Sequence, residues 1–133
     1  MEQEKWIMTI EFTPIGYVTE VLSHDAESKH TVNMRERIQI LPEYREGLNG
    51  LECGNKIQLI FHFHLSKGYR LAEFAKGRDY ETGIFNSRSP HRPNGIGVTE
   101  VTIVSISIDE GEIVVDGGDL FAETPILDIK PAR

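Results

Sequence analysis

The 133-residue sequence has one cysteine, Cys53, and no apolar run long enough to cross a bilayer. A single cysteine excludes an intrachain disulfide and leaves a thiolate zinc cage without ligands, so we expect a cytoplasmic protein. A membrane span needs about 18 or more consecutive apolar residues, so we expect no membrane partner. The first five residues, MEQEK, contain two Glu and one Gln and are not typical of a signal peptide.

The sequence also lacks repeats, low-complexity tracts and linkers, and it has no Gly-x-Gly-x-x-Gly or phosphate-loop motif. The first absence predicts a single domain over residues 1–133, and the second argues against a Rossmann-type cofactor site. Hydrophobic residues make up 39% and charged residues 26% of the chain, which is ordinary globular usage. A chain of this length buries about two thirds of its unfolded surface around one core.

Short strands separated by turn signals account for most of the chain. Strand patterns cover residues 6–12, 15–21, 37–41, 56–63, 98–108, 112–116 and 124–129. We expect helix only as a short segment over 42–47 and a turn over 71–76. Without a strand–helix–strand rhythm, this pattern predicts an all-β fold, mainly an antiparallel β-barrel with a few short helical turns. Residues 1–13 are expected to add an extra strand.

The charge is unevenly distributed. The whole chain carries a net charge of −7, but residues 62–94 hold six basic and three acidic residues, which makes this window +3 and the remainder −10. An acidic total argues against unspecific nucleic-acid binding over the whole surface. The basic window is either a mildly basic surface or a local binding site for an anionic partner.

The most unusual segment is the loop over residues 83–97, GIFNSRSPHRPNGIG. Its two prolines fix φ, and its three glycines allow tight bends, so the loop has a defined shape. It presents two guanidiniums, two hydroxyls, two side-chain amides and an imidazole, which suit carboxylate, phosphate or ribose oxygens. The alternative is a rigid surface loop whose arginines are solvated or bond to its own carbonyls.

Two histidines, His62 and His64, lie two apart in a predicted strand, a spacing found in metal sites. His91, Asp119 or Glu123 would have to supply the missing ligand, and hydrogen-bonded strand histidines are the alternative. We therefore predict no metal. Neither Ser-His-Asp nor Cys-His catalysis is indicated.

A third segment, residues 116–131 (DGGDLFAETPILDIKP), places two glycines before Asp119. Glycines there allow the backbone to approach a ligand closely, and Asp119 can accept hydrogen bonds from a ribose or an amino group. The spacing does not match a calcium-binding EF-hand loop. On its own, the segment is a weak signal, because glycine-rich hairpins are common.

The loop over 83–97 and the segment over 119–131 together resemble two motifs of the TsaA-like, or TrmO-type, tRNA methyltransferases. The similarity covers about residues 14–131. It implies a compact β-barrel that binds S-adenosylmethionine without a Rossmann fold, usually as a homodimer. It also implies methylation of N6 in N6-threonylcarbamoyladenosine, the modified base next to the anticodon of certain tRNAs.

By position, the resemblance places cofactor contacts at His64, Leu65, Arg88, Val98, Asp119, Leu120, Phe121 and Ala122. It places catalytic roles at Arg88, Asp119 and Arg92. Contacts to the substrate or RNA are expected from Arg70, Arg78, His91, Arg92 and Asn94.

The sequence departs from the family pattern in several places. Gly95 replaces a proline, and the Pro-Arg-Gln motif of bacterial members has only Asn33, Met34 and Arg35 as substitutes. The C-terminal RNA-binding domain of many bacterial members is expected to be absent. Two other functions stay open, a methyltransferase of the same scaffold that acts on a smaller substrate and a non-catalytic S-adenosylmethionine-binding module.

Overall fold

The computed structural model describes residues 7–25, 32–74 and 77–133. No helix in these residues has the length and apolar character needed to cross a membrane. In chain order, the elements are β1 (Gly16–Asp25), β2 (Val32–Ile40), the 3-10 helix η2 (Pro42–Leu48), β3 (Lys56–His62), β4 (Ala72–Phe74), β5 (Glu81–Gly83), the 3-10 helix η3 (Ile84–Asn86), β6 (Ile96–Ser107), β7 (Glu112–Asp116) and β8 (Pro125–Pro131).

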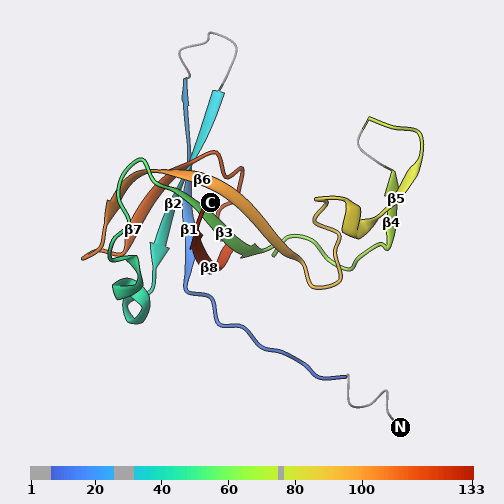
Figure 1. Ribbon diagram of the computed structural model, residues 1–133, viewed down its shortest axis with the longest axis horizontal. Coiled ribbons are helices and arrows are strands. Elements are labelled where there is room, and N and C mark those ends of the chain that lie inside the picture. Colours follow the sequence, from blue (N-terminus) through green and yellow to red (C-terminus); the bar gives the residue numbers. More distant parts are fainter. Residues whose placement is uncertain (1–6, 26–31, 75–76) are drawn as a thin grey trace.

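Six of these strands close an antiparallel barrel in the order β1-β2-β7-β6-β3-β8 (Figure 1). Strands β1 and β2 share nine paired positions, from Gly16 opposite Ile40 to Asp25 opposite Val32. In contrast, β1 and β8 share only two, Gly16 with Ile126 and Tyr17 with Pro125. The predicted all-β barrel is confirmed, and its seam between β1 and β8 is short.

The barrel interior is filled by inward-facing aliphatic side chains, because successive residues of a strand point to opposite faces. In β3, for example, Ile57, Leu59 and Phe61 are buried while their neighbours are more exposed. The same alternation in β2 buries Ile38 and Ile40. It also buries Glu36 in the barrel.

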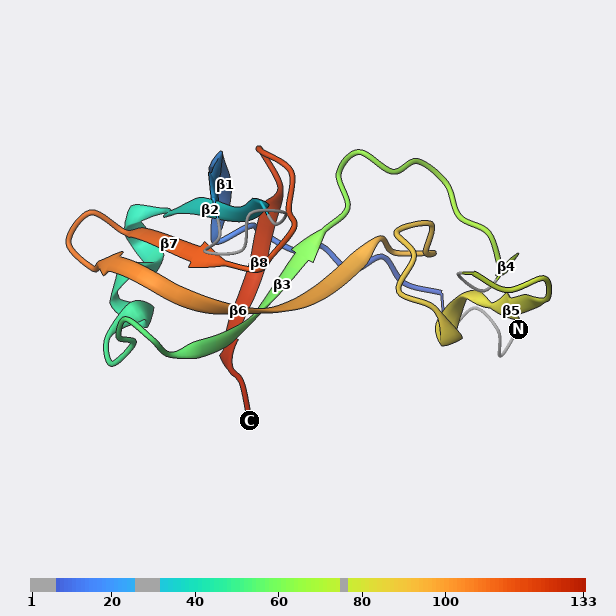
Figure 2. The ribbon, with the colours of Figure 1, turned by 90° about the horizontal axis from the view of Figure 1, so that it is seen from above.

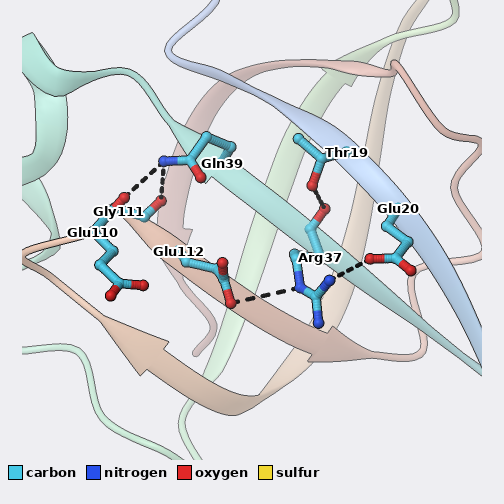
Figure 3. A network of polar contacts seen from close by, with 7 residues as sticks. All are labelled: Thr19, Glu20, Arg37, Gln39, Glu110, Gly111 and Glu112. Carbon is cyan, nitrogen blue, oxygen red and sulfur yellow. Dashed lines mark hydrogen bonds and ion pairs between the residues drawn. The ribbon is translucent and has the colours of Figure 1, made fainter.

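On the outer face, polar side chains link β1, β2 and β7 (Figure 3). Arg37 of β2 forms an ion pair with Glu20 of β1, and its Nε lies 3.5 Å from a carboxylate oxygen of Glu112 in β7. The Gln39 side-chain amide donates to the carbonyl of Glu110 at 2.7 Å. Cross-strand pairs of this kind add modest stability and help to fix the register.

Strands β4 and β5 form a separate two-stranded sheet that extends away from the barrel (Figures 1 and 2). We call the chain between β3 and β6, residues 63–95, the lobe. Inside it Ile84 is buried, and its N–H donates to the carbonyl of Leu71 at 2.9 Å. Several large apolar side chains of the lobe are exposed, namely Leu65, Tyr69, Leu71, Phe74, Tyr80 and Phe85.

The sequence predicted two segments wrongly. Alternation over residues 6–12 predicted a strand, but residues 7–14 form an extended arm without a strand, and Ile7 and Phe12 are 78% and 62% exposed. Trp6 lies outside the described residues. The turn expected over 71–76 is instead strand β4, which pairs with β5 because Ala72, Glu73 and Phe74 lie opposite Gly83, Thr82 and Glu81. The short helix at 42–47 is confirmed as the 3-10 helix η2.

Candidate functional site

A cavity of about 120 Å³ lies where the end of β3 meets the turn between β7 and β8, and we call it the Phe121 cavity. It is lined by Phe61, His62, Phe63, His64, Leu65, Ser66, Pro90, Asp119, Leu120, Phe121 and Thr124. The structure therefore brings two predicted cofactor-contacting groups, His64–Leu65 and Asp119–Phe121, around one space. Ala122, predicted with them, is exposed and does not line the cavity.

The turn over residues 117–124 is anchored at several points. Leu120 is buried in the barrel core, whereas Phe121 is 69% exposed. The Thr124 hydroxyl donates to the carbonyl of Phe121 at 2.6 Å. Asp119 has a φ of +52°, a left-handed conformation that Asp tolerates better than most side chains. The anchors hold the Asp119 backbone in that conformation.

The polar groups of the Phe121 cavity suit a ligand with both apolar and charged parts. The Nε2 atom of His64 is buried and has no hydrogen-bond partner among the described residues. A buried polar atom without a partner is costly, so a ligand that bonds to it gains affinity. The carboxylate of Asp119 and the rings of Phe63 and Phe121 give the cavity one charged acceptor and two aromatic faces for such a ligand.

A second cavity of about 170 Å³ borders the first, because Phe63 lines both. Its other lining residues are Ser87, Arg88, Arg92, Ile96, Gly97 and Val98, and we call it the Arg88 cavity. The rings of Phe61 and Phe63 meet edge to face with their centroids 4.9 Å apart. A Cβ atom at Gly97 would lie only 2.7 Å from Phe61 Cε2 and 2.8 Å from Phe63 Cζ. Both rings therefore depend on the missing side chain of Gly97.

The two arginines of the 83–97 loop bond to backbone oxygens. Arg88 Nη2 donates to the carbonyl of Val98 at 2.8 Å, across the mouth of the loop. Arg92 Nη1 donates to the carbonyls of Ser87 and Ser89 at 2.6 and 3.1 Å. Arg92 therefore behaves as the alternative interpretation expected, because it bonds to carbonyls of its own loop. The catalytic roles of Arg88, Arg92 and Asp119 stay predictions.

Four of the five residues predicted to contact the substrate or RNA lie around the lobe and outside both cavities, whereas Arg92 lines the Arg88 cavity. Arg70 and Arg78 are exposed, and the Arg70 backbone N–H donates to the carbonyl of His91 at 3.2 Å. His91 is half-buried. Asn94 lines a separate, larger groove together with His62 and the N-terminal arm. Arg70 and His91 are thus adjacent, whereas Asn94 lies at another groove, so the structure does not gather all four residues at one point.

Within the described ranges, no group of three His, Cys, Asp or Glu side chains is placed to hold a metal ion. His62 ends strand β3, and His64 lies in the turn that follows. The His64 N–H donates to the carbonyl of His62 at 2.9 Å. The two histidines are therefore not neighbours on one face of a continuous strand.

Sequence reasoning missed Glu36. This carboxyl group is buried inside the barrel, and its Oε1 accepts a hydrogen bond from the N–H of Gly118 at 2.9 Å. The pKa of Glu36 is raised to about 7, mainly by burial; the Gly118 N–H lowers it, and the nearby carboxylates of Asp119 and Asp116 raise it. A signal existed, because Glu36 is in phase with Ile38 and Ile40, but the predicted strand began only at Arg37.

Comparisons with known proteins agree with this geometry. The family described as "tRNA-methyltransferase O N-terminal domain" matches residues 23–132. A probable S-adenosyl-L-methionine-binding protein of Methanothermobacter thermautotrophicus is 32% identical over 93% of this chain and 90% of its own length. The human tRNA (adenine(37)-N6)-methyltransferase is 34% identical over 89% of this chain.

The crystal structure of TrmO from Pseudomonas aeruginosa superposes with a TM-score of 0.67 and 30% identity over 95% of this chain. The present chain spans 57% of that protein and 29% of the human enzyme. The likeness to these longer proteins is therefore to one part of each.

Proposed function

The chain belongs to the family of tRNA-methyltransferase O N-terminal domains, and on that basis we propose that it is an S-adenosylmethionine-dependent methyltransferase that acts on tRNA. The proposed target is N6 of N6-threonylcarbamoyladenosine next to the anticodon. The observation that carries the proposal is the meeting of His64–Leu65 with Asp119–Phe121 around one cavity, beside a second cavity that contains Arg88. A cytoplasmic location follows from a tRNA substrate.

The residues of both cavities fit the cofactor. When bound, S-adenosylmethionine supplies a methyl group already activated on a sulfonium sulfur. Asp119 would accept hydrogen bonds from its amino or ribose groups, and Phe63 and Phe121 would hold the base. Arg88 retains donors for a carboxylate, because only Nη2 is seen to bond within the described residues. The remaining task of the protein is to align the accepting nitrogen.

We also propose that the protein acts as a homodimer. The two cavities are smaller than most ligand pockets, which measure about 300–1,000 Å³. Leu65, Val98 and Phe121 at their edges are exposed, as are many apolar side chains of the lobe. A second copy that covers these side chains would bury apolar surface and enclose the site. Sedimentation is expected to show twice 15.1 kDa, whereas a fully active 15.1 kDa species would contradict a shared site.

A methyl-transfer assay tests the function directly. The full chain is incubated with labelled S-adenosylmethionine and total tRNA from cells that lack the activity, and nucleosides are analysed by mass spectrometry. One additional methyl on threonylcarbamoyladenosine is the expected result. Label in a small metabolite would support a methyltransferase of the same scaffold that acts on a smaller substrate. Cofactor binding without transfer would support a non-catalytic binding module.

The variant Asp119→Asn tests the role of the Asp119 carboxylate, because Asn tolerates the left-handed φ of this position while removing the charge. We expect it to lower transfer at least tenfold, about the loss from a charged hydrogen bond, without a change in melting temperature. Transfer at the wild-type rate would exclude Asp119 from the site.

A further inference from the structure

Glu36 sits at an unusual place for a carboxyl group. It lies on β2 opposite Val21 of β1 and Val115 of β7, and its side chain is 0% exposed. Its Oε1 accepts the Gly118 N–H at 2.9 Å, and its Oε2 is buried without a partner among the described residues. An apolar residue would fill such a core position without the cost of burying a polar atom.

The hydrogen bond from Gly118 is where β2 holds the turn that lines the Phe121 cavity. Gly118 directly precedes Asp119, whose φ of +52° requires support from its surroundings. At the other end of the turn, the Glu123 N–H donates to the carbonyl of Val18 at 2.6 Å. The turn is therefore held by β1 at one end, and at the other by Glu36 together with a longer bond from the Gly117 N–H to the carbonyl of Met34 at 3.5 Å.

Gly118 and Glu36 also fit each other sterically. A Cβ atom at Gly118 would overlap Glu36 Oε1 and lie 3.2 Å from the carboxyl carbon. Its next nearest neighbour would be Val101 Cγ1 at 3.3 Å. The carboxyl group thus occupies the space in which any other residue at position 118 would place its side chain.

We propose that Glu36 is a positioning residue for the cofactor site. By accepting the Gly118 N–H, Glu36 holds Asp119 and Phe121 in place. Glu36 lines neither cavity, so it acts only through the turn. This inference rests on the proposed function for the identity of the ligand, S-adenosylmethionine or its product S-adenosylhomocysteine. The hold on the turn is a property of the free protein and can be measured without any ligand.

The test compares Glu36→Ala, which removes the acceptor, with Glu36→Gln, which keeps an oxygen at the same place. Amide hydrogen exchange reports the hold on residues 118–120, and calorimetry with S-adenosylhomocysteine reports the site. We expect Glu36→Ala to speed exchange and to weaken binding about tenfold, the scale of one lost hydrogen bond. Glu36→Gln is expected to stay within about threefold of the wild type in both.

The control for general stability is Ile57→Ala. Ile57 is equally buried in the barrel, at the end of β3 away from the Phe121 cavity. Its truncation should lower the melting temperature but leave binding and Gly118 exchange unchanged. Equal loss of binding in Ile57→Ala would overturn the proposal, as would wild-type exchange and binding in Glu36→Ala.

The single variant Gly118→Ala keeps the proposal testable if Glu36→Ala fails to fold. Gly118→Ala alone should weaken binding, because its methyl group displaces the carboxyl group or the turn. If Glu36→Ala folds, its background lacks the carboxyl group that the new methyl group would meet, so the additional effect of Gly118→Ala on binding is expected to be small. If the single variant Gly118→Ala binds and exchanges like the wild type, the proposal is wrong. If the wild type itself does not bind S-adenosylhomocysteine, the proposed function fails, while Gly118 exchange still decides whether Glu36 holds the turn.

Discussion

The arginines of the 83–97 loop differ in what their guanidinium groups do. Arg92 donates to two carbonyls of its own loop, whereas Arg88 donates to one carbonyl, that of Val98. An exposed arginine that only carries charge can be replaced by lysine at little cost. A planar, two-pronged contact cannot, because lysine offers one charge on a flexible stem.

Arg88→Lys is therefore expected to lose about 2–4 kcal/mol of transition-state stabilisation, with a melting temperature changed by only a few degrees. The measurements are kcat/KM for methyl transfer and calorimetric melting. Arg92→Lys is the contrast, because it breaks two loop contacts and should mainly lower the melting temperature. Near-wild-type turnover of Arg88→Lys would remove Arg88 from the site.

The buried carboxyl group of Glu36 makes stability depend on pH. Its pKa is about 7 in the fold and near 4.5 when unfolded, so the folded state binds the proton more tightly. The charged groups beside it are Asp119 and Asp116, and Asp116 is paired with Arg35 at 2.7 Å. The contribution of Glu36 is complete below pH 4.5 and is lost as the pH rises through 7.

The free energy of unfolding of the wild type relative to Glu36→Gln should fall by about 3 kcal/mol between pH 4.5 and pH 8. Urea denaturation of both proteins across this range gives the difference, in which the titration of other carboxyl groups cancels. A difference that does not change with pH would show that Glu36 titrates normally.

At the residue scale, most positions that motif similarity predicted to contact the cofactor line the two cavities, and contact with the cofactor stays a prediction. His64, Leu65, Asp119 and Phe121 do line one cavity. The bond from Gly118 to Glu36 joins residues 82 apart in sequence, and no local pattern marks such a pair. Only the inward phase of Glu36 with Ile38 could have indicated a buried carboxyl group.

At the scale of elements, the junction of β3 and β6 carries the wall between the two cavities. Gly97 of β6 lies opposite Phe61 of β3, and the rings of Phe61 and Phe63 occupy the space above it. Any side chain at position 97 pushes both rings toward the cavities. This junction therefore couples barrel packing to the shape of the site.

Gly97→Ala should lower the free energy of unfolding by about 1–3 kcal/mol, the usual cost of overpacking, and weaken cofactor binding as well. Thermal melting and calorimetry with S-adenosylhomocysteine measure the two effects. Gly47→Ala is the matched control, because a Cβ atom there meets nothing within 4 Å. A Gly97→Ala protein as stable as this control would contradict the close packing.

Strand patterns located each of the six barrel strands, but the predicted segment 15–21 ends four residues before β1 does, and the predicted segment 37–41 begins five residues after β2 does. Two-residue alternation also predicted a strand at residues 6–12, where the described residues 7–14 form an exposed arm. Periodicity reports that an apolar face exists but not whether the same chain covers it. The three-residue strands β4 and β5 were too short to show a period at all.

For the whole molecule, the uneven distribution of charge determines where the proposed RNA substrate would be attracted. The +3 window of residues 62–94 coincides with the lobe and the end of β3, while the remainder of the chain carries −10. RNA phosphates are therefore attracted to one side and repelled elsewhere. The logarithm of the affinity falls linearly with the logarithm of the salt concentration, and the slope is proportional to the number of phosphate contacts.

Charge reversal of exposed Arg78 should weaken the binding of several tRNAs alike and reduce the slope of log affinity against log salt by about one. Titrations at several salt concentrations measure both. Lys56→Glu changes the net charge equally at the opposite end of β3 and should have little effect. Affinity that does not respond to salt would rule out phosphate contacts as the basis of binding.

The short seam of the barrel links ligand binding to the integrity of the fold. Beyond the two strand pairs between β1 and β8, it is closed by Val18, whose N–H donates to Thr124 and whose carbonyl accepts from Glu123. These partners belong to the turn that lines the Phe121 cavity. Opening of the barrel at its least paired junction therefore dismantles the cavity, and a ligand that fills the cavity opposes opening. The ligand would therefore stabilise the closed barrel and protect the backbone amides along this seam most strongly from exchange.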